Sequence, residues 1–162
     1  MAYAAISKPS LYQNTVLYTG NGSTQALTGV GFQPDFTWIK NRDATDSHMC
    51  CDAVRGVTKI IFSNLNNIED TDVNSITAFG VDGFSVGSSG NVNTNTEDFV
   101  AWNWKANGAG SLNEVGTIDS TVSVNTTSGF SIVKYTGTGA AATIGHGLGA
   151  VPKAVIVKKL SQ

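Results

Sequence analysis

An internal repeat constrains this chain more than any other feature of its sequence. Three blocks from the first 40 residues return near the end of the chain: VLYTGNG (16–22) as VKYTGTG (133–139), GFQP (31–34) as GAVP (149–152), and DFTWIK (35–40) as KAVIVK (153–158). The offset is 117 residues for the first block and 118 residues for the second. A shared order at nearly one offset indicates duplication, and the period is that of a whole domain.

The repeat predicts how the chain is divided. Residues 1–13 form an N-terminal arm, residues 14–106 one complete β-sandwich module, and residues 107–129 a linker with a connecting strand. Residues 130–162 then form the opening strands of a second, incomplete module. Two strands alone would leave unpaired edges and half a core. We therefore expect that the natural protein continues past Gln162 or that another chain covers this segment; the alternative is that these strands add to the first module.

The balance of residue types predicts an all-β fold. The chain has 18 Gly, 18 Thr and 14 Asn against 7 Leu, which favours strands and tight turns over helices. Alternating apolar segments between turn signals predict these strands: 14–19, 25–28, 36–41, 48–54, 58–63, 76–79, 84–87 and 98–105. An Asp-Gly turn at 82–83 indicates a hairpin between the strands on either side. Many short strands predict an antiparallel β-sandwich.

The three tryptophans lie at alternating strand positions. Trp38 lies on one predicted strand, and Trp102 and Trp104 share one face of another. Because large aromatic side chains dominate the cores of sandwiches, we predict that all three are buried. The alternative is a surface on which sugars stack, although a glycan site is expected rather in the loop at residues 91–98.

The charge pattern argues against two classes of partner. The net charge is −2, and the largest basic cluster is the pair Lys158 and Lys159. Binding to nucleic acid needs a basic surface that releases counterions, so we expect no nucleic-acid partner. No apolar run reaches the length that spans a bilayer, so we expect no membrane partner.

No group of residues predicts an active site. The two histidines, His48 and His146, fall in different modules, and His146 lies between glycines, which favours a turn. The acidic stretch 69–74 carries oxygen ligands but lacks the glycine and closing glutamate of a calcium-binding loop, which favours a solvated loop. We therefore expect no enzyme activity, no catalytic residue, no metal and no cofactor.

Two smaller features predict structural roles. Cys50 and Cys51 are adjacent, and a disulfide between neighbours would strain the peptide bond between them. We expect two free thiols on a strand, one buried and one partly exposed. Asp52 and Arg55 are spaced to form an ion pair that anchors a turn.

The repeated blocks, together with DAVRG (52–56), DGF (82–84) and FVAWNWKA (99–106), resemble a repeated domain in structural and appendage proteins of marine tailed bacteriophages. The resemblance covers nearly the whole chain. It implies a concanavalin-A-like jelly roll in a virion component such as a tail fibre or a capsid decoration, assembled in the host cytoplasm. It also implies other virion proteins as partners, and we expect homo-oligomers.

The N-terminal arm is the predicted attachment to the virion. It carries four apolar or aromatic side chains outside the predicted core: Tyr3, Ile6, Leu11 and Tyr12. Such residues face water unless another protein covers them, so we predict that they dock the module to the particle. The alternative function is a lectin-like module that recognises glycans of the host surface.

Overall fold

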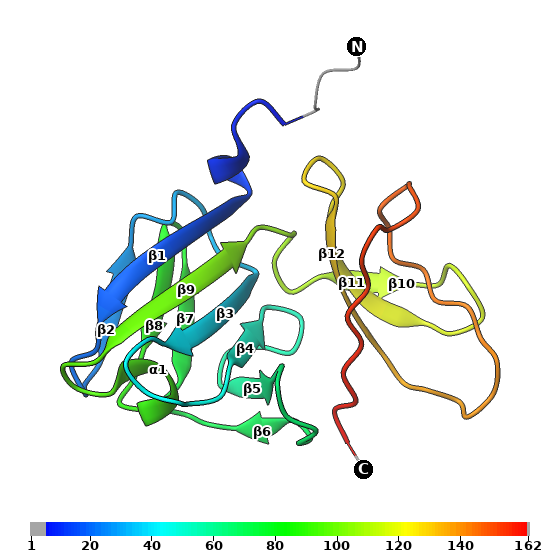
Figure 1. Cartoon of the computed structure of the whole chain (residues 1–162). Helices are drawn as coiled ribbons and strands as arrows, with labels where there is room; N and C mark the ends of the chain where they lie inside the picture. Colours follow the sequence, from blue (N-terminus) through cyan, green and yellow to red (C-terminus); the bar gives the residue numbers. More distant parts are fainter. Residues whose placement is uncertain (1–5, 162) are drawn as a thin grey trace.

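A computed structural model of the chain describes residues 6–161 and consists mostly of antiparallel strands (Figure 1). The strands form three sheets. The first has the order β1 (Gln13–Thr19), β9 (Asp98–Trp104), β3 (Phe36–Asn41), β4 (Met49–Asp52), β5 (Lys59–Phe62) and β6 (Asp70–Thr71). The second has the order β2 (Gln25–Thr28), β8 (Gly83–Val86) and β7 (Ile76–Gly80). The third has the order β10 (Ser111–Asn113), β11 (Ser120–Asn125) and β12 (Phe130–Tyr135).

The predicted all-β, antiparallel class is therefore confirmed. Helical structure within residues 6–161 is limited to the short helix α1 (Gly90–Asn93) and a single 3-10 turn at Pro9–Leu11. Neither has the length and apolar character that a bilayer span requires. The predicted hairpin around residues 82–83 is present as β7 and β8.

The first two sheets share one hydrophobic core, which makes this part of the chain sandwich-like. The buried cluster draws side chains from both sheets and from α1: Tyr18, Leu27, Ile39, Met49, Cys51, Ile60, Ile76, Phe84, Val86, Val92, Phe99 and Ala101. Tyr18 stacks on Phe99 with ring centroids 5.3 Å apart and meets Phe84 edge-on at 6.4 Å. Its hydroxyl donates a hydrogen bond to the backbone oxygen of Val92 at 2.6 Å, so a buried polar group is satisfied.

Strand β9 lies between β1 and β3 and is antiparallel to both. Its inner face carries Phe99, Ala101 and Asn103, and the buried Asn103 accepts a hydrogen bond from the Thr37 hydroxyl at 3.0 Å. β9 therefore joins two strands that come from the beginning of the chain (Figure 1).

The tryptophans correct the prediction of a buried indole core. Trp38 and Trp102 lie opposite each other in the β3–β9 register, and both alternate with core residues such as Ile39 and Ala101. Because successive side chains of a strand point to opposite faces, the indoles lie on the outer face of the sheet. All three, Trp104 included, are only half-buried.

The third sheet begins within the segment predicted as a linker. Residues 107–129 contribute β10 and β11, and β11 pairs along its whole length with β12. The strand predicted at residues 153–158 is absent, because this segment has no strand partner within the described chain. It leads to the chain end beside the first module, where the Glu69 amide donates to the Leu160 backbone oxygen at 3.0 Å.

Both cysteines are buried free thiols, so the expected partly exposed one is corrected. Cys50 is 3% and Cys51 0% exposed. Every residue of β4 is buried, which means that both faces of this strand are covered. Burial raises the pKa of each thiol to about 12.

Candidate functional surfaces

The described part of the N-terminal arm ends against the first module. Leu11 is 45% exposed, whereas Ile6 and Tyr12 are half-buried. The Lys105 amide donates to the Tyr12 backbone oxygen at 2.8 Å, which fixes the end of the arm beside β9. Tyr3 lies outside the described residues. The structure thus presents Leu11 as the most open of the described docking candidates, and the docking role itself stays a prediction.

An aromatic face covers the outside of the six-stranded sheet; we use this name for Phe36, Trp38, Trp102 and Trp104. Trp38 and Trp102 meet edge to face with centroids 6.2 Å apart, and Phe36 lies 5.5 Å from Trp104. Phe130 of β12 stacks on Trp104 at 6.1 Å and covers that end of the face. Half-buried indoles offer flat apolar area to a ligand, together with an N–H donor.

The histidines take local structural contacts. His48 Nδ1 accepts a hydrogen bond from the Trp38 indole N–H at 3.3 Å, which ties it to the edge of the aromatic face. His146 Nδ1 accepts from the Leu148 amide at 3.1 Å, the kind of short-range bond expected of a turn residue.

The ion pair predicted between Asp52 and Arg55 is present, and it is buried. Arg55 Nε lies 2.5 Å from Asp52 Oδ2, and both side chains are about 5–6% exposed. The same guanidinium also lies 3.2 Å from Glu69 Oε2, so the carboxylate of Glu69 turns toward Arg55. Asp52 further accepts the amides of Val54 and Arg55, which closes the turn after β4. Among the described residues, no three carboxylate, imidazole or thiol groups converge as a metal site would require.

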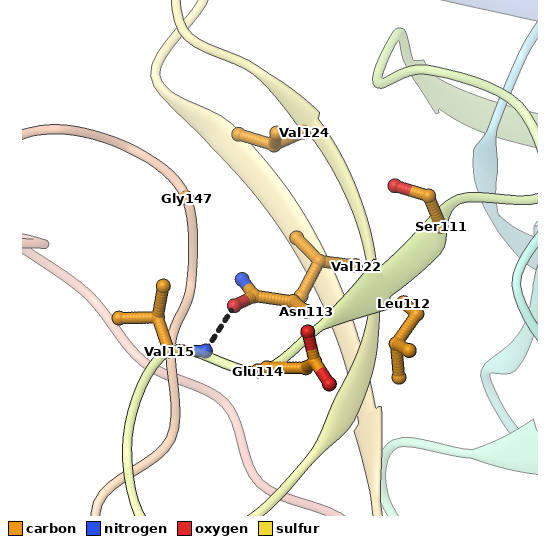
Figure 2. A pocket seen from close by; sticks show the side chains of 8 residues that line it. All are labelled: Ser111, Leu112, Asn113, Glu114, Val115, Val122, Val124 and Gly147. Atoms are coloured by element: carbon orange, nitrogen blue, oxygen red, sulfur yellow. Dashed lines mark hydrogen bonds between the residues drawn. The ribbon is translucent and has the colours of Figure 1, made fainter.

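An open hollow of about 430 Å³ lies on the third sheet (Figure 2). Val122 and Val124 of β11 form one side, and Val115 and Gly147 lie across from them. The Asn113 side chain accepts the Val115 amide at 2.8 Å and holds the rim in place. The lining has few polar groups and carries no pair of acid and base, so it suits apolar contact rather than chemistry.

Large aliphatic side chains are exposed around this hollow and along the last part of the chain. Six of them are between 68% and 82% exposed: Leu112, Val115, Val151, Val155, Ile156 and Val157. The repeat located the last segment in the sequence. The three-residue strand β10, which carries Leu112, has no alternation long enough to be recognised.

Comparison with known proteins leaves the family as the one result. Searches of curated proteins and of solved structures found no significant match. A family model described as a domain of unknown function, DUF7483, matches residues 8–162. This match spans nearly the whole sequence, including both copies of the repeat. The chain therefore belongs to the DUF7483 family.

Proposed function

We propose that this chain is a structural module of a tailed-phage virion, with a role in assembly rather than catalysis. The resemblance to repeated domains of phage structural and appendage proteins supports this proposal. The sandwich-like first module is consistent with the jelly-roll, concanavalin-A-like topology that the resemblance implies. We further propose that the module works as part of a homo-oligomer or beside other virion proteins.

The observation that carries the proposal is the set of exposed aliphatic side chains. Val151, Val155, Ile156 and Val157 are each at least 71% exposed within one short segment. Exposed apolar clusters of this kind are typical of surfaces that other proteins cover. A protein built into a particle has such neighbours permanently available.

Purified virions provide the direct test. The protein should be found by mass spectrometry in gradient-purified particles, and a map of the intact particle should place residues 150–158 against neighbouring density. Absence of the protein from particles that infect normally would refute the structural role.

The N-terminal arm can be tested separately. Deletion of residues 1–13 should leave the first module folded, because the arm contributes no residue to its core cluster. We expect the deletion to prevent incorporation into particles, measured by the ratio of this protein to the major capsid protein. Normal incorporation would exclude the arm as the docking element.

A second candidate function is the recognition of host glycans by the aromatic face. It is favoured by the outward, half-buried position of Trp38 and Trp102, because sugar rings stack on such platforms. Trp102→Ala should then abolish binding on a glycan array, whereas Val81→Ala, at a residue that is 89% exposed on a distant turn, should not change it. Retained binding by Trp102→Ala would exclude this face.

A further inference from the structure

We propose that β12 and residues 153–158 form an acceptor site for one additional antiparallel β-strand of the β9 type, supplied by polypeptide outside residues 1–162. This site follows from the repeat, and it holds whatever assembly the module is built into. The occupant is a strand that begins with acidic residues and continues with alternating aromatic and small side chains, as β9 does.

The repeat assigns the positions of the two acceptor strands. An offset of 117 residues places β12 on β1, and an offset of 118 places residues 153–158 on residues 35–40, which include most of β3. In the first module β1 and β3 do not pair with each other, because β9 lies between them. The second copy therefore has both outer strands of a three-strand arrangement and lacks the central one.

The exposure of matched residues shows that this central strand is missing. Thr37 and Ile39 of β3 are both 0% exposed. Their counterparts, Val155 and Val157, are both 71% exposed although they are more apolar. The local sequence is suited to burial in both copies, so the difference comes from the absent neighbours.

The backbone of the second copy is also open. β11 occupies one edge of β12, and within the described chain no strand pairs with the other edge. Residues 153–158 have no partner on either edge among the described residues. Unpaired strand edges are templates for pairing with another strand.

Charge selects the type and direction of the occupant. In the first module the Arg42 amide donates to the Asp98 backbone oxygen at 2.7 Å, and the two side chains form an ion pair at 3.7 Å. In the second copy the same end of the acceptor carries Lys158 and Lys159. An antiparallel strand that begins as Glu97 and Asp98 do would bring its acidic end to these lysines.

A second copy of this chain is a poor donor of that strand. Its own β9 is hydrogen-bonded on both edges, to β1 and to β3, and buries Phe99, Ala101 and Asn103 completely. Donation would take apart the first module's core, and no contact in the acceptor would offset that loss. A separate segment of the β9 type carries no such cost.

A synthetic peptide provides the test. The full chain of 162 residues would be titrated with a peptide that copies residues 97–105, and binding would be followed by calorimetry and hydrogen exchange. We expect a one-to-one complex in which amide exchange slows about tenfold or more in residues 130–135 and 153–158. Exchange in β7 and β8 should not change. A peptide carrying Ala101→Pro should not bind, because proline cannot donate within a central strand.

Variants of Ile156 separate backbone pairing from side-chain contact. Because the Arg42 amide points to β9, strand alternation places the Trp38 amide on the same edge, and Ile156 is the counterpart of Trp38. Ile156→Pro should therefore abolish peptide binding, whereas Ile156→Ala should retain it. Both variants should fold, since Ile156 is 82% exposed.

Three outcomes would overturn the proposal. One is the lack of peptide binding by a folded chain. Another is protection that maps outside β12 and residues 153–158. The third is a dimer, detected by sedimentation without peptide, in which both segments are already protected, because a second copy would then be the occupant.

Discussion

Residues 14–41 and their counterparts, residues 131–158, share a sequence pattern but have different surroundings. Tyr18 is 9% exposed and packs between Phe84 and Phe99, whereas Tyr135, at the same position of the repeat, is 41% exposed. Leu27 is buried in β2, and its counterpart Ile144 forms only isolated bridges and is half-buried. The comparison teaches that local sequence decides which residues are suited to a core, while strands from elsewhere decide whether the core exists.

The largest expected difference between the two regions is in thiol reactivity. Burial raises the pKa of Cys50 and Cys51 to about 12, so little thiolate is available at pH 8. A cysteine introduced by Val157→Cys in the exposed segment should have an ordinary pKa of about 8.5. It should react with a disulfide reagent roughly a thousandfold faster, as measured by mass-resolved labelling. Equal rates for all three thiols would mean that β4 opens readily.

The next difference is in stability. Ile39→Ala removes a fully buried side chain from β3 and should lower the free energy of unfolding by about 2–5 kcal/mol. Val157→Ala, at the matched position, should change it by less than about 0.5 kcal/mol. Urea unfolding followed by circular dichroism measures both. A large loss for Val157→Ala would show that residues 153–158 are packed in solution.

Removing one hydroxyl from each copy tests the comparison at higher resolution. Tyr18→Phe removes the donor to the Val92 backbone oxygen and leaves a buried acceptor unpaired, which should cost about 1–3 kcal/mol. Tyr135→Phe should be neutral, since the tyrosine side chain is 41% exposed. Thermal unfolding of the two variants gives the result. Equal effects would contradict the assignment of Tyr135 to an uncovered copy.

The smallest expected effect concerns the contact between the two regions. Phe130 is the residue of β12 that stacks on Trp104 and also lies 6.0 Å from Phe36. Phe130→Leu keeps much of the apolar area but loses the aromatic geometry, at about 0.5–1.5 kcal/mol. The emission of Trp104 should shift to longer wavelength as that indole becomes wetter. Unchanged emission would indicate that the regions do not rest on each other in solution.

The strands of the first module could be predicted because alternation and turn residues agree there. β1, β3 and β9 lie within a residue of their expected positions, and Asp82 and Gly83 mark the β7–β8 hairpin. Which face is buried could not be predicted, because both faces of β9 carry large apolar side chains. Phe99 points inward and Trp102 outward, and only the position of the second sheet distinguishes them.

The candidate surfaces depended even more on tertiary structure. Val155 and Val157 alternate like any strand, so the sequence alone predicts a paired strand there rather than an exposed segment. The hollow at Val122 and Val124 is formed by segments that approach from both sides of β11. Such a surface has no pattern of its own in the sequence. The buried contact of Arg55 with Glu69 likewise joins residues 14 positions apart across two loops.

The position of β9 has a consequence for how the protein is made. Leu17 pairs with Val100, so the first long strand to leave the ribosome waits for most of the module before it finds its partner. β3 waits for the same strand. Such long-range pairing makes folding slow. Synthesis from the N-terminus lets β1 reach β9 before its sequence copy, β12, has been made, and we expect this order to protect each module from capture by the next.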